Sequence, residues 1–528
     1  MVVVATKYYH LFQKYLDEDI SEEMIIEDLE EIENGELLES YWIFRPIVAI
    51  RIIKDFDTKG IKYIPMEPTL TIDEFQLMEK IYIELGNTLI LKDITVDVYQ
   101  KEKILVDAFN EIVKEFLVEL DPILRLKLLY YLYRDFIGLG PIDPMLNDPY
   151  VEDISCDGYN IPVFVYHKKY GNIPTTVIFS DLELDRYVQA LVQLSGKHIS
   201  FGNPIIDASL PDGSRLQATY GTEITPRGSS FTIRKFTEEP LTPIDLMRLG
   251  TYTAEQMAYF WLAVENKLNL MVVGETAAGK TTTLNAVLMF LPPDAKVVSI
   301  EDTREISLRH DNWIAGVTRE VTTGDEKSIS MYDLLKAALR QRPEYIIVGE
   351  VRGIEAQTLF QAMSTGHAAY STLHAGDIHQ TIYRLESDPL NVPRSLIQFL
   401  DIVPIQTQWT KAGIRKRRVT AIYEFLGVDP NDKNLLINEV YRWESYDDRY
   451  YMINQPKKLE KIAVIRGESY EETLNELQRR ANFLRFLDKQ DIRDYIHLTH
   501  IIHSYYRNPE ETFEEILREG MKYEITAE

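Results

Sequence analysis

Residues 268–282 constrain the fold more than any other part of the chain, because an apolar run leads directly into a glycine-rich loop. The loop has the pattern Gly274-x-x-x-x-Gly279-Lys280-Thr281, and helix-forming residues follow it. Glycines in this pattern let the backbone N–H groups turn inward, and the following helix adds its positive N-terminal end. The sequence therefore predicts a strand, a phosphate-binding loop and a helix, with a nucleoside triphosphate as the ligand.

The side chains of this loop complete the expected binding site. Lys280 can reach the β- and γ-phosphates, and the Thr281 hydroxyl can ligate Mg²⁺. The predicted cofactors are therefore ATP and Mg²⁺. The residues expected to bind the nucleotide are Gly274, Glu275, Thr276, Ala277, Ala278, Gly279, Lys280, Thr281 and Thr282.

Composition narrows the class of protein. The 528 residues exceed what one core usually holds, so several domains are expected. The chain has 57 basic and 83 acidic residues, a net charge of −26, which argues against non-specific nucleic-acid binding. Cys156 is the only cysteine, which excludes internal disulfides and multi-thiolate metal sites. With no long uncharged apolar stretch and no signal-peptide pattern, we expect a cytoplasmic protein.

Changes in charge, proline content and hydrophobic periodicity divide the chain into four predicted parts. A variable acidic domain for partner docking covers 1–110, and an α+β domain covers 111–236. Residues 237–253 contain two prolines and little periodicity, which indicates a linker. An ATPase domain follows over 254–528, and its last part, from about 465, has only helical patterns.

The ATPase domain alternates apolar strands with amphipathic helices. This alternation predicts an α/β fold with a parallel sheet covered on both faces, of the RecA-like phosphate-loop class, preceded by an α+β domain and a mixed helical segment. The predicted strands are 268–273, 296–301, 345–349 and 369–373.

Polar residues follow the predicted strands of this domain. Because the carboxyl ends of parallel strands meet at the edge of the sheet that carries the phosphate loop, these residues are candidates for catalysis. Glu301 or Glu305 could accept a proton from an attacking water. Glu350 follows four apolar residues and is a candidate to hold Mg²⁺ through its water shell. His374 could donate to the γ-phosphate, whereas His367 is equally consistent with a structural role.

Four motifs carry a resemblance to a known family. They are G-E-T-A-A-G-K-T-T, V-V-S-I-E-D-T-R-E-I, Q-R-P-E-Y-I-I-V-G-E-V-R-G and S-T-G-H-A-A-Y-S-T-L-H-A, in this order. In order and spacing they are similar to the Walker A, Asp box, Walker B and His box of the type II/type IV secretion ATPase superfamily. With G-L-G-P-I-D, D-G-S-R-L-Q and S-S-F-T-I-R-K-F upstream, the resemblance covers roughly residues 135–425. It is greatest to the archaeal branch, the motor ATPases of the archaellum and of archaeal type IV pili.

The resemblance implies roles for single residues and an assembly. It implies Glu301 as general base, Glu350 as the carboxylate associated with Mg²⁺ and His374 as the γ-phosphate sensor. Arginines of the preceding domain contact the phosphates in this family, and Arg215, Arg227 and Arg234 match their positions. The family also implies a homo-hexamer with nucleotide between the two domains of each subunit.

The implied function is that of a motor ATPase that couples Mg-ATP hydrolysis to assembly or rotation of a type IV pilus-like filament, archaellum or pseudopilus. Its expected partner is a polytopic membrane platform protein, so the hexamer would be peripheral at the inner face of the cell membrane. Two alternatives stay open. One is a DNA-directed secretion or conjugation motor, and the other is a nucleotide-binding assembly scaffold with little turnover.

Three further features have less specific interpretations. The basic run 411–418 is consistent with a β-hairpin or a subunit contact, or with docking to a membrane partner. His497, His500 and His503 recur on one predicted helix, where a metal site or a structural role would fit. The acidic run 17–39 indicates either a solvated helical face or a surface for a basic partner.

Overall fold

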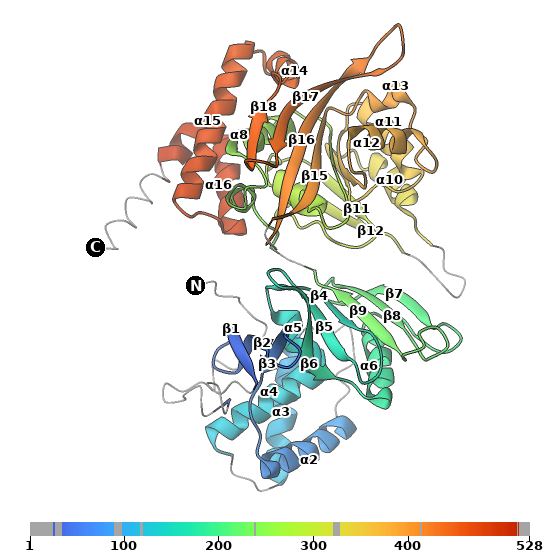
Figure 1. Cartoon of the computed structure of the whole chain (residues 1–528), viewed down its shortest axis with the longest axis vertical. Helices are drawn as coiled ribbons and strands as arrows, with labels where there is room; N and C mark the ends of the chain where they lie inside the picture. The colour runs from blue at the N-terminus through green and yellow to red at the C-terminus, as the bar shows by residue number, and fades with distance from the viewer. Residues whose placement is uncertain are drawn as a thin grey trace. The chain divides into compact units, whose positions relative to one another are not determined.

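The computed structural model forms two compact units, Met1–Phe236 and Thr237–Glu528, each built around its own nine-stranded sheet (Figure 1). The residues that the structure describes are 25–26, 34–88, 98–116, 120–236, 239–319, 328–411, 414–514 and 516. Most of the acidic run 17–39 lies outside them. No helix in these ranges combines the length and the apolar character needed to cross a bilayer.

In the first unit, neighbouring strands run antiparallel except where β3 meets β6. Across the sheet the strands are β1 (Gly35–Phe44), β2 (Val48–Asp55), β3 (Ile61–Met66), β6 (Gly171–Ile178), β5 (Pro162–His167), β4 (Val151–Cys156), β9 (Ser230–Arg234), β8 (Arg215–Thr219) and β7 (Ile205–Ser209). The helices are α2 (Ile72–Thr88), α3 (Val98–Glu115), α4 (Pro122–Phe136), η2 (Gly140–Ile142), α5 (Asp143–Asn147) and α6 (Asp181–Leu194).

The segments 1–110 and 111–236, which the sequence predicts as separate domains, share this sheet and one hydrophobic core. Their junction is the parallel pairing of β3 with β6, where Tyr63 lies opposite Thr175. The buried Tyr63 hydroxyl also donates to the Asp148 carboxylate at 2.8 Å. Because buried polar groups need partners, this bond fixes the two segments to each other.

In the second unit, six strands run parallel and three more extend the sheet in antiparallel order. Across the sheet they are β12 (Trp313–Val317), β11 (Val297–Glu301), β13 (Tyr345–Val348), β14 (Ala368–Leu373), β10 (Leu270–Gly274), β15 (Ile402–Lys411), β16 (Ile414–Val428), β17 (Leu435–Glu444) and β18 (Arg449–Met452). The predicted parallel sheet is confirmed. The parallel strands β12 and β15 and the antiparallel extension are additions that the sequence did not predict.

The helices of this unit cover both faces of the sheet (Figure 1). They are α7 (Pro243–Arg248), α8 (Ala254–Glu265), α9 (Lys280–Leu288), α10 (Met331–Arg340), α11 (Glu355–Ser364), α12 (Ile378–Glu386), α13 (Arg394–Ile397), α14 (Lys458–Arg466), α15 (Tyr470–Lys489) and α16 (Tyr495–Arg507). Adjacent residues of a strand point to opposite faces, so Val272 packs in the core with α8 and α9. Val273 packs in a second core with α10–α13.

Residues 237–253, which the sequence predicts as a linker, contain α7. Pro243 occupies the first turn of this helix, where a proline is favoured, so the same proline that suggested a linker starts a helix. Thr242 and Asp245 form a capping box, and Ile244 is fully buried in the core of the second unit. Residues 239–253 therefore belong to the second unit, and α7 packs in its core.

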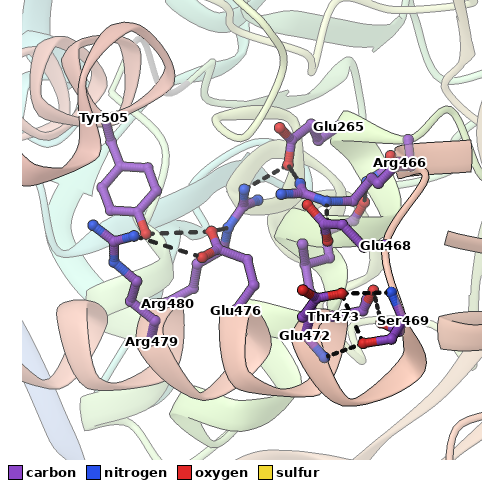
Figure 2. A network of polar contacts seen from close by, with 12 residues as sticks. Glu265, Arg466, Glu468, Ser469, Glu472, Thr473, Glu476, Arg479, Arg480 and Tyr505 are labelled. Atoms are coloured by element: carbon purple, nitrogen blue, oxygen red, sulfur yellow. Dashed lines mark hydrogen bonds and ion pairs between the residues drawn. The ribbon is translucent and has the colours of Figure 1, made fainter. Parts of the chain in front are cut away.

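The carboxy-terminal helices are held to α8 by a buried arginine. Arg480 of α15 is 3% exposed, and its Nη2 donates to Glu265 of α8 at 2.6 Å (Figure 2). Its Nε donates to Glu476 at 2.9 Å, and its guanidinium lies 4.9 Å from the ring centroid of Trp261. A guanidinium this deeply buried needs these partners, so the contacts among Arg480, Glu265 and Glu476 hold α15 against α8.

Replacing Arg480 by methionine is expected to lower the free energy of unfolding of the protein by about 3–5 kcal/mol, because two carboxylates lose their buried partner. The matched control is Arg479→Met. The Arg479 side chain is 45% exposed, and its ion pair with Glu476 is long, with 4.0 Å between Nη1 and Oε2. That change is expected to alter the free energy by less than about 1 kcal/mol. Urea denaturation followed by circular dichroism measures both, and equal losses would contradict the assigned role of Arg480.

Candidate functional site

The predicted phosphate-binding loop connects the end of β10 to the start of α9. Gly279 is the residue before α9 and has a φ of +91°, a conformation that favours glycine. Ala277 has a φ of +61°, and residues 275–277 are exposed. The α9 N-terminus thus faces an open, curled backbone, which is the arrangement that binds a phosphate.

Two contacts fix the ends of this loop. The Lys280 ammonium donates to the backbone carbonyl of Glu275 at 2.9 Å, so it bends back over the loop. Gly274 lies opposite Gln406 of β15, and a Cβ atom at Gly274 would come within 2.7 Å of the Gln406 carbonyl oxygen. Only glycine allows this approach of β10 to β15. Thr281 is half-buried in the first turn of α9.

Glu301 is the last residue of β11 and is only 2% exposed. Its Oε1 accepts hydrogen bonds from the backbone N–H groups of Glu305 (2.8 Å) and Ile306 (2.9 Å). Its Oε2 is buried and has no hydrogen-bond partner among the described residues. Burial raises the pKa of Glu301 to about 7, although the two backbone bonds oppose the shift. A carboxyl with one free oxygen and this pKa can accept a proton at neutral pH.

Glu350 follows β13 and lies at the same edge of the sheet. Ile300 of β11 pairs with Val348 of β13, so the two strands end side by side. A Cβ atom on Gly349 would lie 3.1 Å from Cγ of Glu301, which places the Glu301 side chain directly against this strand end. The Glu350 carboxylate accepts from Nη2 of Arg352 at 2.6 Å. The sequence did not predict this ion pair. If Glu350 binds Mg²⁺, it must either release Arg352 or bind both partners at once.

The two predicted histidines lie at opposite ends of β14. His374 follows the strand at the edge that carries the loop, since Leu373 pairs with Val273. Two residues further on, a Cβ atom on Gly376 would lie 3.4 Å from Oε1 of Glu275. His367 precedes the strand, roughly 20 Å from His374 along the chain direction, and its Nδ1 is 3.2 Å from the Thr365 hydroxyl. His374 is thus beside the loop, and His367 is not.

The three predicted arginines belong to the first unit, and only two of them lie together. Arg215 of β8 and Arg234 of β9 are directly opposite each other in an antiparallel pair. Arg215 also forms an ion pair with Asp207, with Nη2 2.5 Å from Oδ2. Arg227 is exposed in the loop that joins the opposite ends of these strands. The length of β8, about 13 Å, separates that loop from Arg215.

Comparison with known proteins identifies the family. A family model described as "Type II/IV secretion system protein" matches residues 165–403. The uncharacterized protein MJ0900 of Methanocaldococcus jannaschii is 38% identical over an alignment of 484 residues that covers 87% of this chain and 87% of that protein. This chain belongs to the type II/IV secretion ATPase family. MJ1287 of the same organism is 48% identical over 247 residues, 47% of this chain and 92% of its own length.

A bacterial member of the family is also similar. The type IV secretion system protein PtlH of Bordetella pertussis is 32% identical over 256 residues, covering 42% of this chain and 75% of PtlH. The loop, both carboxylates and His374 all fall within the part that the family model matches. MJ0900 and MJ1287 both come from the archaeon Methanocaldococcus jannaschii, which fits the predicted archaeal branch of the secretion ATPases.

Sequence reasoning missed residues of β15 and β16 that contact the loop of this secretion ATPase. Gln406 donates from Nε2 to the Thr283 hydroxyl of α9 at 2.6 Å, and both side chains are buried. Arg417 donates from Nε to the Ala277 carbonyl at 3.0 Å. The basic run 411–418 was the only signal for this contact, and the β-hairpin interpretation of that run is confirmed by the pairing of β15 with β16.

The histidines of α16 and the cysteine are the remaining candidates. The described residues contain no group of three or more His, Cys, Asp or Glu side chains that could hold a metal ion, so His497, His500 and His503 form no such site. His503 instead lies near His310, with ring centroids 6.5 Å apart. Cys156 is buried, and burial raises the pKa of its thiol to about 11.

Proposed function

We propose that this secretion ATPase hydrolyses Mg-ATP at the loop 274–282 and uses the energy to drive assembly of a type IV pilus-like filament, archaellum or pseudopilus. The observation that carries the proposal is the buried Glu301, with one unpartnered oxygen and a pKa near 7, at the sheet edge that holds the phosphate loop. A scaffold that only binds nucleotide has no need of such a group.

The proposed chemistry divides the work among four elements. The backbone of 274–282 and Lys280 bind the phosphates, and Thr281 and Glu350 hold Mg²⁺, largely through water. The bound Mg²⁺ would neutralise charge that develops on the transferring phosphoryl group. Oε2 of Glu301 orients the attacking water and accepts its proton. His374 donates to the γ-phosphate and so distinguishes ATP from ADP.

The proposed assembly is a homo-hexamer that works with a polytopic membrane platform protein at the inner face of the cell membrane. Two observations support it. The chain belongs to a family of secretion-system proteins, and its relative PtlH is described as a component of a type IV secretion system. The net charge of −26 favours a protein partner over nucleic acid.

We propose that Arg215 and Arg234 contact the phosphates during turnover, because their paired positions place two guanidinium groups at one end of β8 and β9. Alanine at either position is expected to lower the rate of hydrolysis while ATP binding is retained, since the guanidinium acts on transition-state charge. Arg227→Ala, at the other end of the hairpin, is the comparison. Unchanged turnover in both the Arg215 and Arg234 variants would contradict this role.

Glu301→Gln is expected to lower kcat for ATP hydrolysis between about 10²- and 10⁴-fold while the Kd for ATP changes little, because the amide cannot accept a proton. The wild-type rate should rise with pH and level off above an apparent pKa close to 7, since the base must be ionised to act. Steady-state kinetics from pH 5.5 to about 9 and calorimetric binding measure both quantities.

The matched control is Glu305→Gln, because Glu305 is the second carboxylate that the sequence allowed as a base. Its backbone N–H donates to Glu301. Burial is the main cause of the raised pKa of Glu301, and the negative charge of Glu305 adds to it. This change should therefore leave kcat close to wild type and move the pH profile to slightly lower pH. Loss of activity in the Glu305 variant with normal activity in the Glu301 variant would reverse the assignment.

A further inference from the structure

Strand β16 carries two adjacent arginines that bind different parts of the second unit. Neighbouring residues of a strand point to opposite faces of its sheet. Arg417 contacts the phosphate loop, and Arg418 contacts the turn 249–251 that follows α7. One short piece of strand therefore joins the nucleotide-binding loop to the first helix after the unit boundary at Phe236.

The contact of Arg417 with the loop is close. Its Nε donates to the Ala277 carbonyl at 3.0 Å, in the exposed middle of the loop. A Cβ atom added at Gly279 would lie 3.1 Å from Cδ of Arg417. Because Gly279 has no side chain, the aliphatic part of Arg417 can lie against the loop. A shift of the Ala277 peptide must either break this bond or move Arg417.

The contact of Arg418 with the turn is equally close. Arg418 is 4% exposed, and its Nη1 donates to the Leu249 carbonyl at 2.8 Å. Gly250 has a φ of +68°, and a Cβ atom there would lie 3.3 Å from Nη2 of Arg418. Asp448 fixes the same guanidinium by accepting from Nε at 2.7 Å and from Nη2 at 3.0 Å.

A second residue from the same sheet binds this turn. The Tyr450 hydroxyl of β18 is 2.6 Å from the Thr251 carbonyl and 3.1 Å from the Gly250 carbonyl. Leu249 is the C-cap residue of α7, so the turn is the end of that helix. The position of the α7 end is thus set by the antiparallel part of the sheet.

We propose that β16 couples the phosphate loop to the end of α7, with Arg417 as the positioning residue on the loop side and Arg418 as the anchor on the α7 side. In β15, Gln408 pairs with Arg417 and Thr407 pairs with Arg418. This pairing makes β16 stiff at the two arginines, so a displacement of Arg417 by the loop also displaces Arg418. The inference rests on the proposed binding of nucleotide at the loop. Ordering of the loop by phosphates then reduces the motion of the turn 249–251.

Hydrogen exchange of backbone amides in the full-length protein, with and without saturating ADP, tests this coupling. The Gly250 and Thr251 amides each donate at 2.9 Å within the turn, to Met247 and Leu246 respectively. ADP is expected to slow their exchange several-fold in the wild type. In Arg417→Met, saturating ADP should still protect residues 275–281, but the slowing at Gly250 and Thr251 should be lost.

Two further variants make the test specific. Arg417→Lys keeps a charged donor that can reach the Ala277 carbonyl, so it should restore part of the slowing. Arg442→Met removes a charge from the neighbouring strand β17, where Arg442 pairs with Glu439, and should behave as wild type. These two results would separate the loop contact from a general loss of charge or stability.

The outcomes distinguish this inference from the proposed function. If ADP protects 275–281 but leaves Gly250 and Thr251 unchanged in the wild type, or slows them equally in Arg417→Met, the coupling is wrong and the nucleotide site stands. If the wild type shows no protection at 275–281 and no calorimetric binding of ADP, both the proposed site and the coupling are overturned.

Discussion

The parallel register of four neighbouring strands is the constraint on which the candidate site depends. Ile300 pairs with Val348, Val348 with Ser371, and Val273 with Leu373, so β11, β13, β14 and β10 all end at one edge. Residues far apart in sequence, from the loop to His374, come together there only because each strand ends in register with its neighbour. A slip of one residue would turn every side chain to the other face of the sheet.

Burial at this edge gives Glu301 its chemical character. A carboxyl in water has a pKa too low to act as an effective base at neutral pH, whereas the low polarity around Glu301 raises its pKa to about 7. The same burial leaves Oε2 without a partner among the described residues. The fold thus maintains an unfavourable group at the point where a reaction would use it, which is typical of a functional site.

Local patterns in the sequence were enough to predict the loop, the strand ends and the helices on both faces, because these depend on periodicity and on short motifs. The prediction failed where contacts between distant segments decide the structure. Pro243 suggested a linker but starts α7, and the pairing of Tyr63 with Thr175 joins segments predicted as separate domains. Arg417 and Gln406 could not be assigned to the loop, because nothing local specifies that β15 and β16 extend the sheet beside β10.

The proposed motor is tested by the rate of ATP hydrolysis per chain, measured over a range of protein concentrations together with the size of the assembly, with and without Mg²⁺. A hexameric motor requires Mg²⁺ for hydrolysis, and its specific activity rises as hexamers form. Nucleotide binding with negligible turnover at every assembly state would contradict it and would favour a nucleotide-binding scaffold.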